Sequence, residues 1–207
     1  MEYKEFQLTV QQRTLFGCVW EPVGKINGVI SLVHGLGEHS QRYLPVAEML
    51  EEFGFALTAL DLWGHGRSPG KRGHIHNFEF ILDLVVELLR ETGSQYPGVP
   101  QFLYGHSMGG NIVLNFLARR QPQISGSIVT GPWLRLVKPL PNLVEQLIHL
   151  LSRLYPTFTQ PNGLASENLS HDQAVVSAYD HDPLVHDRIS VKTVSELTRA
   201  AEWIMTN

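Results

Sequence analysis

Apolar residues along the chain follow two spacings, and each spacing predicts a different kind of element. Short, nearly continuous apolar runs are typical of strands buried on both faces of a parallel sheet. Four such runs occur, at residues 29–33, 55–60, 101–104 and 127–130. Apolar residues that recur every three or four positions predict amphipathic helices between these runs. Three are expected, over residues 44–53, 78–92 and 108–120.

Each predicted helix carries one apolar stripe, which we expect to face the sheet. The three stripes are Val46, Met49, Leu50 and Phe53; Phe78, Ile81, Val85 and Leu88; and Ile112, Val113, Phe116 and Leu117. Strands that alternate with helices in this order predict an α/β fold with a mainly parallel sheet. Ahead of them, residues 6–10 and 14–20 predict an antiparallel strand pair joined by a polar turn at residues 11–13.

The alternation breaks after Pro132. One strongly amphipathic helix follows, and its apolar stripe consists of Leu143, Leu147, Leu150, Leu151 and Leu154. Residues 162–170 are expected to form a loop, and a last helix is expected over about 191–205. The pattern therefore divides the chain into residues 1–132, 133–190 and 191–207.

Composition excludes some classes of function. The formal net charge of −4 makes a nucleic-acid partner a poor expectation. The single cysteine, Cys18, cannot form an internal disulfide, which fits a reducing compartment. The N-terminus shows no apolar leader, and no apolar run is long enough to span a bilayer. These features predict a cytoplasmic protein, although they allow peripheral contact with a membrane surface.

The segment Gly105-His106-Ser107-Met108-Gly109 matches the G-x-S-x-G pattern of a nucleophile elbow. It follows a predicted strand and opens a predicted helix, which is the context that the pattern requires. Ser107 is the predicted nucleophile. Gly105 and Gly109 are expected where side chains would crowd the neighbouring strand and helix. His106 is expected to point away from Ser107 and to support the turn.

A second glycine-containing segment, His34-Gly35-Leu36-Gly37-Glu38-His39, follows the first parallel strand. In a serine hydrolase of this kind, that position supplies one N–H group of the oxyanion hole. The predicted oxyanion donors are the backbone N–H groups of Leu36 and Met108, with His34, Gly35 and Gly37 in support. A dinucleotide-binding interpretation fails, because Ser40 stands where the third glycine of that motif is required.

Four motifs together resemble the monoacylglycerol lipase and lysophospholipase branch of the α/β-hydrolases, a serine-aminopeptidase-type superfamily. They are His34–His39, Asp61–Ser68, Gly70–His74 and Gly105–Gly110. The resemblance implies a serine ester hydrolase that acts on small lipid esters and needs no cofactor or metal. It also implies that residues 133–190 form a cap, that residues 191–207 return to the core, and that the leucine stripe contacts lipid or membrane. The alternative is that the stripe packs on the core.

In this fold the nucleophile is followed along the chain by an acid and then by a histidine base. The resemblance places both beyond the last predicted helix, together with the final sheet strands. We therefore expect that the triad is incomplete in the printed chain, that it is nearly inactive, and that a sheet edge is exposed. The alternative function is a non-catalytic, hydrolase-like protein that binds lipid or a partner.

A polar cluster in the predicted cap, Asp180-His181-Asp182 with His186-Asp187, also invites a metal-site interpretation. Its spacing matches no zinc signature, so no metal ligands are predicted there. Asp182, which precedes Pro183, is instead expected to cap a helix N-terminus.

Overall fold

The structure, a computed structural model, describes residues 1–135 and 141–207. Its main feature is a six-stranded sheet in the order β1-β2-β4-β3-β5-β6. The strands are β1 Glu2–Val10, β2 Arg13–Glu21, β3 Gly28–Val33, β4 Phe55–Leu60, β5 Gln101–His106 and β6 Gly126–Thr130. β1 and β2 pair antiparallel, β2 pairs antiparallel with β4, and β3, β4, β5 and β6 are parallel. This topology confirms the predicted fold class and the antiparallel pair at the N-terminus.

The first two strands are longer than predicted and are joined by a tight turn. Gln11 and Gln12 both adopt positive φ angles, of 48° and 63°. Two consecutive left-handed residues are typical of the two-residue hairpin turn, whose twist matches that of the flanking strands. The predicted polar turn is therefore confirmed, with Arg13 already in β2.

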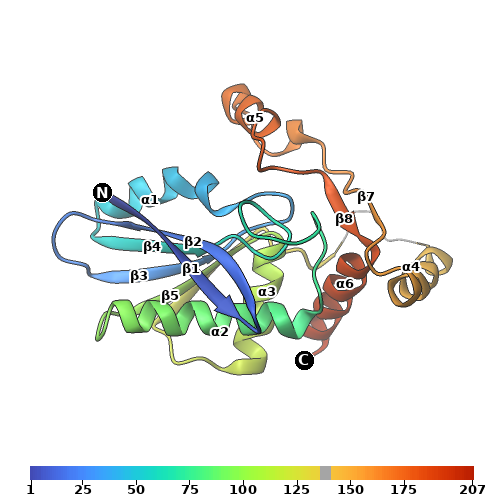
Figure 1. Ribbon diagram of the computed structural model, residues 1–207, viewed down its shortest axis with the longest axis horizontal. Coiled ribbons are helices and arrows are strands. Elements are labelled where there is room, and N and C mark those ends of the chain that lie inside the picture. The colour runs from blue at the N-terminus through green and yellow to red at the C-terminus, as the bar shows by residue number, and fades with distance from the viewer. Residues whose placement is uncertain (136–140) are drawn as a thin grey trace.

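Helices cover both faces of the sheet (Figure 1). A short 3₁₀ turn, η1 Ser40–Tyr43, and α1 Leu44–Glu51 lie on one face, and α2 Phe78–Gln95 and α3 Met108–Arg120 lie on the other. The stripe predicted for α2 is fully confirmed, because all four of its members are buried. In α3, Ile112, Val113 and Phe116 are buried, and Leu117 packs against the same core.

The stripe predicted for the first helix is partly wrong. Met49 is 57% exposed and Phe53 is 63% exposed, whereas Ala47 is buried and Val46 and Leu50 pack beside it. The helix ends at Glu51, so Phe53 falls in the turn before β4 and no longer shares a helical face. A spacing of three or four residues predicts a common face only while the helix continues.

The expectation that all four parallel strands are buried on both faces is wrong for β6. Within the described residues, β6 pairs only with β5 and forms the edge of the sheet. Three residues of β6 are exposed, namely Ser127, Ile128 and Thr130, and the exposed fraction of Ile128 is 46%. An apolar run reports hydrophobicity alone, so it cannot distinguish a central strand from an edge strand.

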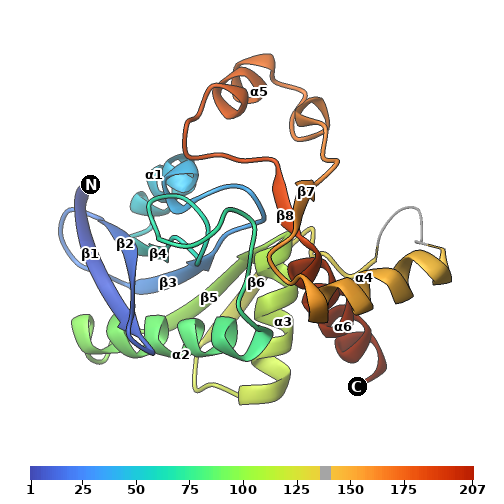
Figure 2. The same cartoon turned by 45° about the vertical axis from the view of Figure 1, so that its right-hand side comes forward.

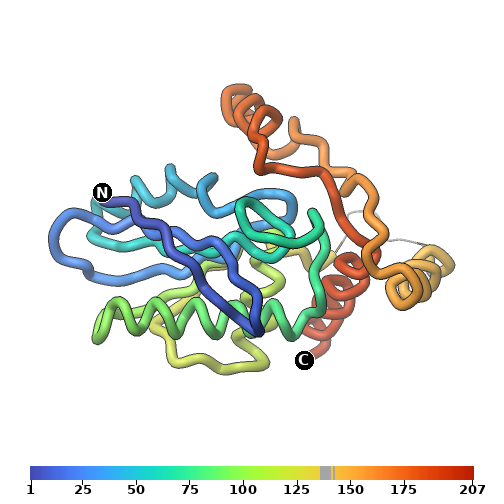
Figure 3. Tube along the Cα trace, in the orientation of Figure 1, coloured from blue at the N-terminus to red at the C-terminus, as the bar shows by residue number. Residues whose placement is uncertain are grey.

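The chain after residue 141 forms a separate layer at one end of the sheet, coloured orange in Figures 1 and 2. Its elements are α4 Asn142–Leu154, β7 Thr159–Pro161, the 3₁₀ turn η2 Ser166–Asn168, α5 Gln173–Asp180 and β8 Arg188–Ser190. The antiparallel pair β7–β8 and helix α5 were not predicted from the sequence. The trace in Figure 3 then returns the chain through α6 Val191–Thr206, which packs on α3 and α4.

Helix α4 exposes most of its leucine stripe. Exposed fractions are 77% for Leu143, 51% for Leu147, 54% for Leu150 and 61% for Leu154. The opposite face of the helix packs on α6, where Ser152 is buried and His149 Nδ1 lies 2.9 Å from Ser195 Oγ. The alternative that this stripe packs on the core is therefore wrong for those four leucines within the described structure. None of the described helices combines the length and the apolar character needed to cross a bilayer.

Candidate active site

Ser107 occupies the sharp turn between β5 and α3, with φ of 54° and ψ of −114°. An L-residue adopts such angles only where its surroundings impose them, at a cost of about 1–3 kcal/mol. Three backbone hydrogen bonds do so. The Ser107 N–H donates to Thr130 O at 3.0 Å, and Ser107 O accepts from the N–H groups of Asn111 at 3.1 Å and Trp133 at 3.0 Å. The turn is therefore held by α3 and by the segment at the end of β6.

The elbow glycines lie where backbone segments approach each other closely. A Cβ atom on Gly109 would overlap the carbonyl oxygen of Val33, and one on Gly105 would overlap the carbonyl oxygen of Gly109. Both contacts are with backbone atoms, which cannot rotate away as a flexible side chain can. Small residues at these positions let the start of α3 pack directly against the end of β3.

The loop after β3 lies against the elbow. A Cβ atom on Gly35 would be 3.3 Å from Ser107 Cβ, so this backbone passes directly beside the serine. Glu38 holds the loop in place. Its Oε1 atom accepts hydrogen bonds from the Gly35 N–H at 2.6 Å and from the Tyr43 hydroxyl at 2.8 Å. The sequence motif contains Glu38, but sequence reasoning assigned it no role because its acceptor function depends on how the loop folds.

The predicted oxyanion donors are the backbone N–H groups of Leu36, in the loop after β3, and Met108, in the elbow. Both residues are buried. Met108 is the first residue of α3, so its N–H has no intrahelical acceptor. Within residues 1–135 and 141–207, neither N–H group donates a hydrogen bond to the protein. Both donors are therefore unengaged in the described structure, and their role in binding an oxyanion stays a prediction.

Two histidines near the serine have structural partners. His34 is completely buried, and its Nε2 accepts from the Leu62 N–H at 2.9 Å. Nδ1 therefore carries the proton and donates to Gly35 O at 2.7 Å. Burial holds the pKa of His34 below its usual value, which keeps this imidazole neutral. His106 Nδ1 lies 2.9 Å from Thr130 Oγ1, which ties the end of β5 to the end of β6.

A third loop, residues 61–68, is organised by the fully buried carboxylate of Asp61. Its Oδ1 accepts from the Ser40 N–H and its Oδ2 from the Arg67 N–H, both at 2.8 Å. Gly66 has φ of 49°, and a Cβ atom there would overlap the same carboxylate. Sequence reasoning noted this motif only as part of a resemblance. Its physical role is to join the loop after β4 to the turn that begins α1.

The segment that follows α5 contacts these loops through one side-chain pair and one backbone hydrogen bond. His39 Nε2 lies 2.8 Å from Asp182 Oδ2, and the backbone N–H of His186 donates to Gly37 O at 2.9 Å. The prediction that Asp182 caps a helix is wrong, because its Oδ1 accepts from the Leu184 N–H at 2.9 Å in a turn. Partial burial opposes ionisation of Asp182, but the hydrogen bonds from His39 and Leu184 lower the pKa of its carboxyl.

The histidines that follow Ser107 in the sequence have other partners or are exposed. His149 contacts Ser195, His181 contacts Ser177 O at 2.8 Å, and His186 contacts Gly64 O at 3.2 Å. His171 lies on the exposed surface. In the part of the chain that the structure describes, no side chain is hydrogen-bonded to Ser107 Oγ. The hydrogen bonds of these histidines therefore do not orient any of them toward Ser107 as a general base.

A mainly parallel sheet, a strained serine between strand and helix, and a glycine loop packed beside that serine define the α/β-hydrolase class. The family model described as serine aminopeptidase, S33 matches residues 24–207, and the chain belongs to this family.

Similar proteins include enzymes named for lipid esters. The chain is 34% identical over 168 residues to the monoacylglycerol lipase of Mycolicibacterium smegmatis, covering 81% of this chain and 60% of that protein. It is 33% identical to human monoglyceride lipase, covering 83% of this chain and 56% of that protein. The crystal structure of Paleococcus ferrophilus monoacylglycerol lipase matches with a TM-score of 0.83 and 35% identity, covering 93% of this chain and 72% of that chain. The chain thus spans somewhat more than half the length of these two sequence relatives.

Proposed function

We propose that this protein is a serine ester hydrolase acting on monoacylglycerol or lysophospholipid esters, with Ser107 as the nucleophile. The observation that carries the proposal is the strained Ser107 turn with the backbone of Gly35 beside it. Membership of the serine aminopeptidase, S33 family and the similarity to monoacylglycerol lipases support the same chemistry.

The proposed reaction proceeds in two acyl-transfer steps. Ser107 Oγ attacks the ester carbonyl carbon while its proton passes to a general base. The carbonyl oxygen becomes an oxyanion, which the N–H groups of Leu36 and Met108 stabilise. The bond from the carbonyl carbon to the alcohol oxygen breaks, and the alcohol leaves with the proton. Water then attacks the acyl-enzyme in the same way and releases the fatty acid and free Ser107.

The environment of Ser107 favours this chemistry electrostatically. The serine lies at the N-terminus of α3, where unpaired N–H groups and the helix dipole favour negative charge. The first turn of α3 contains no acidic residue that would oppose this effect. Removal of one oxyanion donor typically costs 10²- to 10³-fold in rate, so loss of either the Leu36 or the Met108 N–H contact is expected to slow the reaction on that scale.

The cap supplies two features that suit a lipid ester with a polar alcohol. A cavity of about 230 Å³ lies within the proposed cap, lined by both polar and apolar residues between positions 162 and 187. Its lining includes Asn162, Tyr179, Asp180, Asp182 and His186. The exposed leucines of α4 offer an apolar surface that suits contact with a lipid layer. In this proposal, residues 1–132 form the core, residues 133–190 form the cap, and residues 191–207 return the chain to the core.

Labelling with a fluorophosphonate probe tests the proposal. The wild-type chain and Ser107→Ala are compared, with intact-mass measurement of the adduct and assay of monoacylglycerol and lysophosphatidylcholine hydrolysis. Labelling that requires Ser107 is the expected result, with only slow fatty-acid release, because none of the described histidines after Ser107 is placed as its general base. A folded wild-type chain that binds lipid vesicles but is not labelled would favour the alternative, a non-catalytic lipid-binding protein.

A further inference from the structure

Two of the three backbone hydrogen bonds that hold Ser107 come from the segment at the end of β6, through Thr130 and Trp133. This segment follows an edge strand, so the sheet supports it from one side only in the described structure. The position of the nucleophile therefore depends on what holds residues 130–133 in place.

Asn111 holds Trp133 from the other side. Its Nδ2 donates to Trp133 O at 2.8 Å, while the Trp133 N–H donates to Ser107 O at 3.0 Å. The backbone N–H of Asn111 also donates to Ser107 O, at 3.1 Å. One residue therefore binds the elbow directly through its backbone and indirectly through its side chain. The backbone of Trp133 is therefore held by two hydrogen bonds, one to Ser107 O and one from Asn111 Nδ2.

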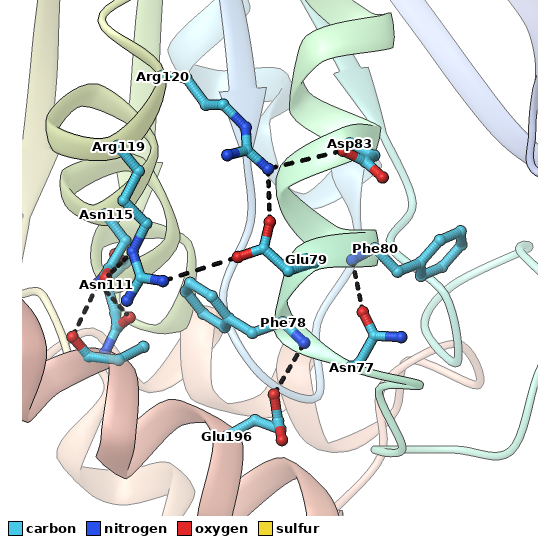
Figure 4. Close-up of polar contacts among 11 residues, drawn as sticks. Asn77, Phe78, Glu79, Phe80, Asp83, Asn111, Asn115, Arg119, Arg120 and Glu196 are labelled. Carbon is cyan, nitrogen blue, oxygen red and sulfur yellow. Dashed lines mark hydrogen bonds and ion pairs between the residues drawn. The ribbon is translucent and has the colours of Figure 1, made fainter.

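The same amide reaches the helix that follows the cap. Asn111 Nδ2 donates a second hydrogen bond, to Leu197 O of α6 at 3.2 Å, and Asn111 Oδ1 accepts from Asn115 Nδ2 at 3.2 Å. Figure 4 labels both asparagines on α3 and draws the hydrogen bonds that join Asn111, Asn115 and Arg119 as dashed lines. The Asn111 side chain is fully buried and uses both its donor and its acceptor groups. A buried amide satisfied in this way has one well-defined orientation.

The next asparagine makes a similar contact without reaching the elbow. Asn115 is equally buried and donates to Ala200 O of α6 at 3.1 Å, and its Oδ1 accepts from Arg119 Nε at 3.1 Å. It has no hydrogen bond to Trp133 or to Ser107 among the described residues. The two residues therefore differ in their link to the nucleophile and resemble each other in burial and in contact with α6.

We infer that Asn111 is a positioning residue for the Ser107 nucleophile, acting through Trp133, and that it joins the elbow to the helix that carries the cap. This inference rests on the proposed function of Ser107. Helix α4 packs on α6, where His149 contacts Ser195. A displacement of α6 would therefore move Leu197 O, one of the two acceptors of the Asn111 amide that also binds Trp133. Loss of the Asn111 side chain leaves α3 intact but removes the contact that clamps Trp133.

The test compares Asn111→Leu with the matched control Asn115→Leu. Each substitution removes one buried amide of similar size, so both variants are expected to lower Tm to a similar extent. The maximal rate constant for fluorophosphonate labelling is expected to fall about 10- to 100-fold in Asn111→Leu only, because misplacement of a reacting group by about 1 Å has effects of that size. The probe concentration giving the half-maximal rate should stay unchanged. Equal labelling rate constants in the two variants would overturn the inference.

Two further measurements keep the test decisive. If Asn111→Leu does not fold, Asn111→Ala removes the amide without adding bulk or charge, Asn115→Ala is its control, and the same slowing is expected in Asn111→Ala only. Hydrogen exchange at the Trp133 amide should accelerate in the Asn111 variant and not in the Asn115 variant, and equal protection would also overturn the inference. A wild-type chain that is not labelled at Ser107 would count against the proposed function, whereas the exchange measurement reports on the Asn111 clamp independently.

Discussion

His39 Nε2 lies 2.8 Å from Asp182 Oδ2, which joins the loop beside Ser107 to the turn after α5 across 143 residues of sequence. The His39 side chain is 4% exposed and the Asp182 side chain 21% exposed, so solvent screens this pair only weakly. The contact holds the turn after α5 against the loop that follows β3. The hydrogen bond from the His186 backbone N–H to Gly37 O is a second polar link between the same two segments.

Asp182→Asn is expected to destabilise the protein at neutral pH and to have little effect in acid. The pKa of the Asp182 carboxyl is lowered in the folded state, so its contribution to stability is present above the ordinary pKa of 3.8. That contribution is lost as the pH falls through the lowered folded value. At pH 7 a loss of about 1–3 kcal/mol is expected, as for a hydrogen bond to a charged group. Urea unfolding at pH 7 and at pH 3 measures the loss of unfolding free energy under each condition. The loss is expected to be smaller at pH 3, which lies below the ordinary pKa of 3.8, and an equal loss at the two pH values would contradict this assignment.

Gly109→Ala is expected to prevent stable folding or to cost several kcal/mol. The added Cβ would overlap the carbonyl oxygen of Val33, so α3 would have to move away from β3. Overpacking of this kind costs about 1–3 kcal/mol in a side-chain core, and a backbone obstacle cannot relax as a side chain does. Gly126→Ala is the control, because its Cβ would lie 3.3 Å from the ring of Phe102. Thermal unfolding of the two variants should separate them by more than 5 °C, and similar melting temperatures would argue against tight packing at the elbow.

Glu38→Gln is expected to slow labelling of Ser107 by about 10-fold while the fold is retained. The substitution replaces a carboxylate that accepts from both the Gly35 N–H and the Tyr43 hydroxyl, and an amide oxygen is a weaker acceptor for both. Exposed Glu48 on α1 offers a control, since Glu48→Gln changes the net charge by the same amount. Second-order labelling rates of the two variants give the comparison. Slowing of similar size in both would point to net charge, not to the loop, as the cause.

Leu147→Glu is expected to leave Tm nearly unchanged and to weaken binding to phosphatidylcholine vesicles that contain monoacylglycerol. Leu147 is 51% exposed on α4, so a charged side chain there remains in water in the free protein and must be dehydrated in a lipid layer. Gln146→Glu adds the same charge at the neighbouring exposed position and is the control. Vesicle co-sedimentation measures binding. Unchanged binding by Leu147→Glu would exclude this face of α4 from lipid contact.

Local pattern was sufficient for much of the core. The apolar runs identified the four parallel strands, and the stripe of α2 faces the sheet as its spacing predicted. The strand–turn–helix setting of Ser107 was also readable, because a strained turn between a buried strand and a helix constrains five consecutive residues. These features depend on interactions between near neighbours in the sequence, so the order of residue types encodes them directly.

Tertiary structure decided the features that depend on which segments meet. The β7–β8 pair and the contact of His39 with Asp182 have no local signal in the sequence, and the exposed sheet edge at β6 was expected from the family resemblance, not from local pattern. The two acceptors of Asn111 lie 22 and 86 residues further along the chain. Apolar periodicity shows which face of an element is buried but not which element covers it, and a polar side chain gains its role only from the partner that the folded chain brings within hydrogen-bonding distance.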